Sequence, residues 1–174
     1  QSYYVFYAAS TSYIQSHTFY VGISQDHEEL WQASEFIKNE LPDVNIIILD
    51  KPTSGPADTV YQMLCQSDIP IDEPFFVRDA DTLFSHTISE ENSICVAYAA
   101  QNSSLNLSSK SFVQANKEGM VSDISENNII SGVFSVGGYS FEDTEVFTDH
   151  YENFLSSDRP YVSDIINEAI MNGE

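Results

Sequence analysis

The chain has 174 residues, and 42% of them are hydrophobic, which is enough to build one ordinary domain around a buried core. Its six lysines and arginines are outnumbered by 27 aspartates and glutamates, so the formal net charge is −21. A chain this acidic lacks the cationic surface that binds nucleic acid or an anionic membrane, and it would need a divalent cation to hold a phosphate ligand.

The N-terminal stretch "QSYYVFYAAS" has no basic region of the kind that opens a secretory signal. No apolar run approaches the roughly 18 residues that span a membrane. The two cysteines, Cys65 and Cys95, are far apart in the sequence, and the chain has no C-x-x-C pair. We therefore expect a cytoplasmic protein whose cysteines are reduced and buried in the core.

The sequence begins with alternating helix and strand signals. Residues 2–15 predict the end of a helix, and residues 17–24 predict a strand. Residues 26–41 follow as an amphipathic helix, in which Asp26 and Glu29 resemble a capping box. The apolar residues of this helix share one face: Leu30, Trp31, Phe36, Ile37 and Leu41.

Two more strands flank a second helix. Residues 44–50 are almost entirely apolar, as in a strand that is covered on both faces of a sheet. The next helix is expected to begin at Gly55 and Pro56, because proline at the first helical position gives up only an unpaired N–H. Its inward stripe consists of Val60, Met63 and Leu64. Residues 74–84 ("PFFVRDADTLF") predict a third strand, and this alternation predicts a parallel sheet with crossover helices.

The second half of the sequence is richer in strands. Residues 93–101 predict a strand, residues 111–126 a hairpin that turns at a Glu-Gly pair, and residues 129–141 a further strand. Two helices follow, and the last has apolar residues at helical spacing: Val162, Ile165, Ile166, Ala169 and Ile170. Because no repeat or linker divides the sequence, we expect one α/β domain with a mixed sheet over residues 1–174.

Two aspartates, Asp79 and Asp81, follow the apolar residues of the third predicted strand. Ligands of open α/β sheets bind beyond the carboxyl ends of the strands, and residues two apart on a strand share a face. Paired carboxylates suit Mg²⁺ or Mn²⁺, which prefer hard oxygen ligands. The alternative is a turn in which the aspartates cap loop amides. Arg78 beside them is expected to form a structural ion pair or, second, to contact a phosphate.

Several segments resemble the sugar nucleotidyltransferases, the family that joins a nucleoside triphosphate and a sugar 1-phosphate into a nucleotide-sugar. "PTSGPADTV" resembles the loop and helix start that hold the nucleobase, and "PFFVRDADTLF" resembles the strand that ends in a metal-binding aspartate. "GMVSDISENNIISGVFSVGGYSF" resembles the segment with the sugar-contacting glutamate and glycines, and "RPYVSDIINEAIMNGE" is similar to the helix that follows. The resemblance implies a Rossmann-like, three-layer α/β/α fold of the nucleotide-diphospho-sugar transferase type.

The resemblance also implies roles for particular residues. Asp81 would be the catalytic metal ligand and would share an Mg²⁺ or Mn²⁺ ion with Asp79. Glu126 would contact the sugar, and Gly137 and Gly138 would let the backbone approach it closely. The alternatives are a solvated strand-end acid and a β-bulge. The residues expected to bind the nucleotide, partly through amides at a helix start, are Thr53, Gly55, Pro56, Ala57 and Thr59.

The sequence departs from the family at three points. The family opens with a Gly-rich loop that carries an arginine and a lysine, whereas this sequence opens with "QSYYVFYAAS". The family's second metal-binding aspartate would lie beyond the final "MNGE", and the lysine that follows the sugar-binding glutamate is replaced by Asn127.

We expect a metal-dependent sugar-phosphate nucleotidyltransferase that supplies nucleotide-sugars for polysaccharide synthesis. Its partners would be a nucleoside triphosphate and a sugar phosphate. A nucleotide-sugar-dependent glycosyltransferase is the alternative enzyme. The departures leave two explanations open: a truncated enzyme, or a degenerate relative that binds nucleotide or sugar without turnover.

Overall fold

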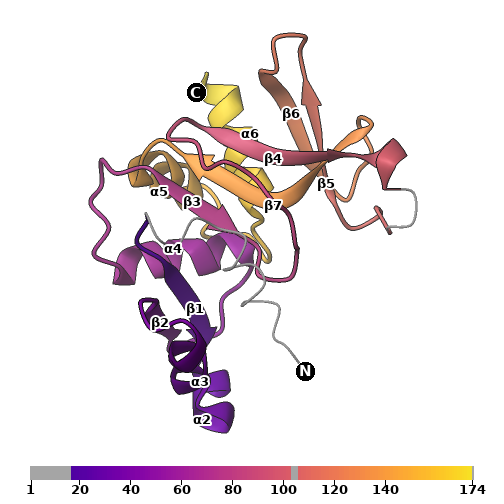
Figure 1. Ribbon diagram of the computed structural model, residues 1–174. Helices are drawn as coiled ribbons and strands as arrows, with labels where there is room; N and C mark the ends of the chain where they lie inside the picture. The colour runs from indigo at the N-terminus through magenta and orange to yellow at the C-terminus, as the bar shows by residue number, and fades with distance from the viewer. Residues whose placement is uncertain (1–16, 103–105, 174) are drawn as a thin grey trace.

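The computed structural model describes residues 17–102 and 106–173 (Figure 1). The helix predicted for residues 2–15 lies outside the described residues. In chain order the elements are β1 (Tyr20–Ser24), α2 (Gln25–Trp31), α3 (Ala33–Glu40), β2 (Asn45–Leu49), α4 (Pro56–Gln66), β3 (Phe75–Arg78), β4 (Ser93–Tyr98), the short 3₁₀ helix η2 (Ala99–Gln101), β5 (Ser111–Ala115), β6 (Val121–Glu126), β7 (Val133–Phe141), α5 (Thr144–Glu152) and α6 (Val162–Asn172).

The helix predicted over residues 26–41 is in fact two helices, α2 and α3, separated at Gln32. Gln32 has a left-handed backbone with φ of 48°, which ends α2. The carboxylate of Glu28 then accepts from the backbone N–H and the hydroxyl of Ser34, at 2.8 and 2.7 Å, and so caps the first turn of α3. The break turns Leu30 and Trp31 outward, where they are 72% and 70% exposed, so the prediction of one shared apolar face was wrong.

The start of α2 also differs from the prediction. Ser24 is the N-cap, and its hydroxyl accepts from the backbone N–H of His27 at 3.3 Å. The predicted capping box of Asp26 and Glu29 was therefore wrong, because the helix begins two residues earlier than that pattern requires.

The first two described strands, β1 and β2, pair in parallel through the α2–α3 crossover, as predicted. Helix α4 lies between this two-stranded sheet and the larger sheet (Figure 1). A Cβ atom on Gly22 of β1 would lie 2.5 Å from the sulfur of Met63, so α4 packs directly on β1. Val60 and Leu64 of α4 pack against the core of the larger sheet, as predicted, whereas Met63 of the same predicted stripe contacts β1 instead.

The larger sheet has the order β3-β7-β5-β6, and β4 pairs with β7 as well. All of its pairings are antiparallel, including β3 with β7, where Val77 lies opposite Tyr139. Within the described residues β3 therefore does not continue the parallel pair β1–β2, and the prediction of one parallel sheet holds only for β1 and β2. The predicted hairpin is present as β5–β6 and turns through Gly119, which has φ of 88°.

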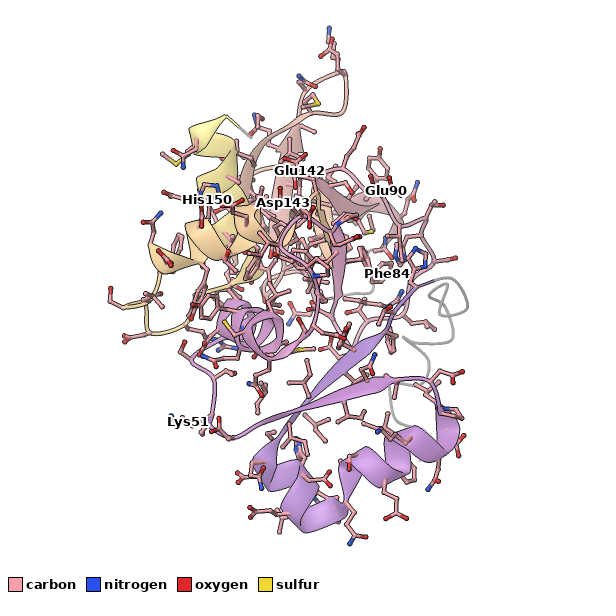
Figure 2. All side chains as sticks on the ribbon, turned by 90° about the vertical axis from the view of Figure 1, so that its left-hand side faces the viewer. Lys51, Phe84, Glu90, Glu142, Asp143 and His150 are labelled. Carbon is pink, nitrogen blue, oxygen red and sulfur yellow. The ribbon has the colours of Figure 1, made fainter. Side chains whose placement is uncertain are left out.

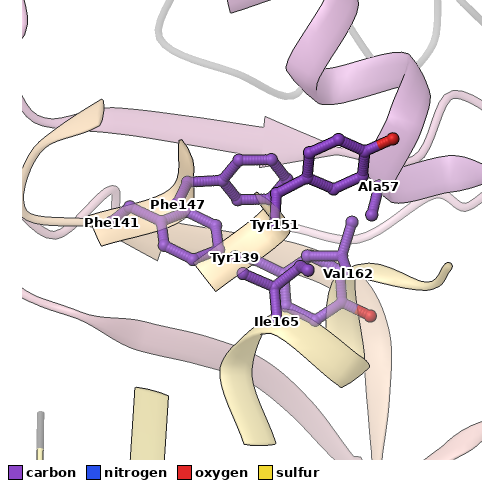
Figure 3. Packing of buried hydrophobic residues seen from close by; sticks show 7 residues of the cluster. All are labelled: Ala57, Tyr139, Phe141, Phe147, Tyr151, Val162 and Ile165. Carbon is purple, nitrogen blue, oxygen red and sulfur yellow. The ribbon is translucent and has the colours of Figure 1, made fainter. Parts of the chain in front are cut away.

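The main core joins α4, β7, α5 and α6 (Figure 3). Two of its aromatic rings, those of Phe141 and Phe147, pack edge to face, with centroids 5.2 Å apart and planes at 88°. Ala57 at the start of α4 and Val162 at the start of α6 both belong to this cluster. The two helix starts are therefore held together by the same buried side chains.

The two cysteines are free thiols, but Cys65 is exposed and Cys95 is half-buried. The prediction that both are buried was wrong for Cys65, which lies near the end of α4 on its outward side. Across the described residues, none of the helices combines the length and the apolar character that a membrane crossing demands.

Candidate functional site

Asp79 lies immediately beyond the end of β3, against the backbone of β7. Its backbone N–H donates to the carbonyl oxygen of Gly137 at 2.8 Å. Gly137 has φ of 84°, and a Cβ atom there would lie 2.2 Å from Oδ2 of Asp79. The glycine is thus required twice, by its left-handed backbone and by the close approach of the carboxylate.

The neighbouring glycine, Gly138, serves a different contact. A Cβ atom on Gly138 would lie 2.7 Å from Cζ of Phe84 and 3.0 Å from the sulfur of Cys95. The sequence predicted that both glycines would lie beside the sugar. In the structure, Gly137 lies against the side chain of Asp79 and Gly138 lies against the ring of Phe84.

Asp81 lies in the turn that follows β3 and is exposed. Its Oδ1 accepts from the hydroxyl of Thr82 at 3.2 Å. Because the strand ends at Arg78, the alternation that would place Asp79 and Asp81 on one strand face does not apply to them. The two aspartates are nevertheless close enough for the charge of Asp81 to act on Asp79.

Electrostatics single out Asp79 among the acids of the site. Loss of solvent around its carboxylate is the main cause that raises its pKa to about 6, and the charges of Asp81 and Glu126 raise it further. Lys110 acts in the opposite direction. The residue as a whole is exposed, so the loss of solvent concerns the carboxylate where it lies against Gly137, and Asp79 is not part of the core.

Lys110 is a member of this site that the sequence prediction missed. It immediately precedes β5, and its carbonyl oxygen accepts from the backbone N–H of Asn127 at 3.1 Å. Position 127 is where the resembled family has a lysine. Here a lysine lies just before the adjacent strand β5, and its charge acts on Asp79.

Glu126, the last residue of β6, is half-buried and tied to two elements. The hydroxyls of Ser111 on β5 and Ser163 on α6 both donate to its Oε2, the second at 3.1 Å. Ser111 and Ser163 are only 8% and 2% exposed. A solvated strand-end acid, the alternative considered from the sequence, does not fit this arrangement.

The loop before α4, which the sequence predicts to bind the nucleotide, is held by hydrogen bonds to other residues of the chain. The hydroxyl oxygens of Thr53 and Thr59 lie 2.7 Å apart, and the hydroxyl of Thr59 donates to the carbonyl of Gly55 at 3.2 Å. Ala57 is fully buried, and its backbone N–H donates to the carbonyl of Pro160 at 3.0 Å. One of the amides proposed for a ligand at the start of α4 therefore already has a protein acceptor.

A polar hollow of about 180 Å³ adjoins the same loop. Lys51, Thr53, Asp58 and Gln62 are among the residues that line it. Lys51 lies beyond the end of β2, well separated from Phe84 and the loop after β3 (Figure 2). The hollow thus belongs to the loop at the start of α4.

Arg78 fixes the loop that follows the aspartates. Its guanidinium donates to the carbonyl oxygens of Phe84 at 2.9 Å and Thr82 at 3.4 Å. The same group lies 4.0 Å from the centre of the Phe84 ring. These contacts with backbone and ring hold residues 82–84 beside the end of β3. The ion pair and the phosphate contact expected for Arg78 stay predictions.

The residues that could hold a metal ion are two carboxylates, Asp79 and Asp81. Among the described residues, no group of three or more histidine, cysteine or acidic side chains is arranged to bind a metal. Two carboxylates without further protein ligands suit Mg²⁺, which usually keeps several waters and takes its remaining oxygens from substrate phosphates. The pair therefore fits a substrate-bridging Mg²⁺ better than a structural metal.

Comparison with known proteins identifies the fold. No protein-family model matches the sequence, and no curated protein matches it either. Among solved structures, the nucleoside-diphosphate-sugar pyrophosphorylase from Vibrio cholerae RC9 is similar with a TM-score of 0.76 and 19% identity, over 95% of this chain and 73% of that one. The chain has the nucleotide-diphospho-sugar transferase fold.

Two further structures with this fold are similar to the chain. The inositol-1-phosphate CTP transferase from T. maritima has a TM-score of 0.70 and 16% identity, over 90% of this chain and 63% of that one. UDP-glucose pyrophosphorylase complexed with UDP-glucose has a TM-score of 0.70 and 13% identity, over 97% of this chain and 75% of that one. The predicted fold class is confirmed.

Proposed function

We propose that the chain carries the substrate site of a sugar-phosphate nucleotidyltransferase, which forms a nucleotide-sugar and pyrophosphate from a nucleoside triphosphate and a sugar 1-phosphate. The observation that carries this proposal is the meeting of Asp79, Asp81, Glu126 and Lys110 at the ends of β3 and β6. The similar structures, which are nucleotidyltransferases by name, support it.

The reaction forms one phosphorus–oxygen bond and breaks another. An oxygen of the sugar 1-phosphate attacks the α-phosphorus of the triphosphate, and the bond from that phosphorus to the pyrophosphate oxygen breaks. Such transfers depend on in-line positioning and on neutralisation of phosphate charge, with little covalent work by the protein. When bound, Mg²⁺ would supply that neutralisation, and Asp79 and Asp81 would hold it.

Each remaining group has a task that follows from its chemistry. Glu126, an acceptor already oriented by two hydroxyls, would accept hydrogen bonds from sugar hydroxyls. Lys110 would attract the sugar phosphate toward a group of side chains that are otherwise acidic. The loop from Thr53 to Thr59 would contact the nucleotide beside the polar hollow.

The test is release of pyrophosphate by the full-length protein, with Mg²⁺ and a panel of triphosphates and sugar 1-phosphates. Asp81→Asn should reduce the rate on the order of 100-fold, because a metal ligand is lost. Asp72→Asn, at an exposed turn before β3, should leave the rate unchanged and serves as the matched control.

Other outcomes identify other functions. Transfer of sugar from a nucleotide-sugar to an acceptor, with Mn²⁺ preferred and without pyrophosphate release, would indicate a glycosyltransferase. Metal-dependent binding of nucleotide with no turnover of any substrate pair would indicate a degenerate binding module. Either result would replace the proposed reaction.

A further inference from the structure

The start of α6 (Pro160–Ser163) contacts both halves of the proposed substrate site. At one end, the carbonyl of Pro160 accepts from the backbone N–H of Ala57 in the nucleotide loop, at 3.0 Å. Three residues later, the hydroxyl of Ser163 donates to Glu126 at 3.1 Å. A four-residue segment therefore joins two groups that lie about 70 residues apart in the sequence, Ala57 and Glu126.

The α6 start is held in place by a helix cap, by packing in the main core and by contact with the loop before α4. The carboxylate of Asp164 accepts from the backbone N–H of Tyr161 at 2.8 Å, which caps the first turn of α6. Val162 is buried in the main core beside Ala57 (Figure 3). A Cβ atom on Gly55 would lie 2.6 Å from the carbonyl oxygen of Pro160, so the loop and the α6 start are in direct contact.

Two hydrogen bonds fix the direction of the Glu126 carboxylate. Both Ser111 and Ser163 donate to the same oxygen, Oε2. Within the described residues these two bonds leave Oε1 for a ligand. Because the two serines come from different elements, β5 and α6, the direction of the carboxylate depends on how α6 is seated.

We propose that Ser163 is a positioning residue for sugar recognition, and that the α6 start couples the nucleotide loop to the sugar-binding carboxylate. This inference rests on the proposed function, because it assumes that Glu126 contacts the sugar. A structural role alone would require only that the buried hydroxyl of Ser163 find an acceptor. The positioning role requires in addition that its loss weaken binding of the sugar and spare the nucleotide.

The experiment compares two ligands of the full-length protein in Mg²⁺ by calorimetry. One is whichever of UDP-, CDP-, dTDP- and GDP-glucose binds the wild type most tightly, and the other is the matching nucleoside diphosphate. Ser163→Ala should weaken the nucleotide-sugar about tenfold, the usual effect of losing a hydrogen bond to a charged group, and change the diphosphate less than twofold. Ser163→Thr should restore the affinity, and Ser140→Ala, an equally buried hydroxyl on β7, should change neither ligand.

A double-mutant cycle with Glu126→Gln separates the two proposals. If Ser163 acts through Glu126, its replacement should have little further effect once Glu126 is changed. Equal weakening of both ligands, or additive effects in the cycle, would overturn the positioning role. If Glu126→Gln weakens the nucleotide-sugar but Ser163→Ala does not, only the positioning role fails.

The remaining outcomes are equally decisive. If Glu126→Gln leaves both affinities unchanged, the proposed function fails at the sugar site, and the inference fails with it. Should Ser163→Ala not fold, Ser163→Cys keeps a similar volume with a weaker donor, and it should weaken the nucleotide-sugar several-fold by the same reasoning. Unchanged affinity in that variant would overturn the inference.

Discussion

Replacing Gly137 by alanine tests the contact on which the arrangement of the acids depends. The new Cβ atom would lie 2.2 Å from Oδ2, 2.7 Å from Cγ and 2.8 Å from Cβ of Asp79. Rotation of the Asp79 side chain can relieve the first two of these distances but not the third, because the Cβ atom of Asp79 is fixed by its backbone. The backbone of Asp79 is in turn held by its hydrogen bond to the carbonyl of Gly137 at 2.8 Å.

Two separate costs add in this variant. A left-handed backbone costs a non-glycine residue about 1–2 kcal/mol, and Gly137 has φ of 84°. Overlap with a fixed neighbour adds about 1–3 kcal/mol. Gly119 offers a matched control, because it has φ of 88° and no heavy atom lies within 4 Å of a Cβ atom there. Gly119→Ala should therefore carry only the cost of the left-handed backbone.

The assay is urea unfolding followed by far-ultraviolet circular dichroism, combined with Mg²⁺ titration of each folded variant. Gly137→Ala should lower the free energy of unfolding by about 2–5 kcal/mol, and Gly119→Ala by about 1–2 kcal/mol. Gly137→Ala should also weaken Mg²⁺ binding, whereas Gly119→Ala should not. Equal destabilisation by the two variants would show that Asp79 does not lie against Gly137, and the proposed metal pair would lose its geometric basis.

Three further predictions concern neighbouring contacts. Gly55→Ala places a Cβ atom 2.6 Å from the carbonyl oxygen of Pro160, and since φ there is extended, overlap alone should cost about 1–3 kcal/mol in urea unfolding. The pKa of Asp79 is raised from 3.8 to about 6, so its contribution to stability is present below pH 3.8 and is lost as the pH rises through 6. The free energy of unfolding, measured from pH 4 to 7, should therefore fall with pH more steeply in the wild type than in Asp79→Asn. Lys110→Gln removes the charge that opposes this shift, so carboxyl nuclear magnetic resonance should report a higher pKa for Asp79, while Lys117→Gln on the exposed hairpin turn should leave it unchanged.

The order of helices and strands follows from local patterns, and the structure departs from it where distant contacts intervene. The hairpin β5–β6 and the apolar stripe of α6 were predicted because their signals are local. The spacing of apolar residues and the turn residues can be recognised within a few neighbouring positions of the sequence. The break between α2 and α3 at Gln32 was not predicted, because glutamine is not a residue that signals a turn. There, Glu28 supplies a cap for Ser34 across the break, a contact that helical periodicity does not encode.

The candidate site shows the same division between local and distant information. The D-x-D pair marked the correct strand end, because an acidic pair after an apolar run is a local signal. What surrounds it comes from elsewhere in the chain: Gly137 lies beneath Asp79, and Lys110 faces it from the start of β5. The amide of Ala57 was expected to face a ligand, yet its acceptor, Pro160, lies some hundred residues further along the sequence.

The three carboxylates at the ends of β3 and β6 differ in what their surroundings supply, and this difference is the physical basis for separate roles. Two hydroxyls donate to Glu126, so this side chain is already oriented as an acceptor. Asp79 instead loses solvent and meets the charges of Asp81 and Glu126, which together raise its pKa. A divalent cation beside Asp79 would offset that cost, because it favours the ionised carboxylate, and in a chain of net charge −21 it would also let a phosphate approach. These surroundings support the proposal that Asp79 and Asp81 hold the metal and that Glu126 contacts the sugar hydroxyls.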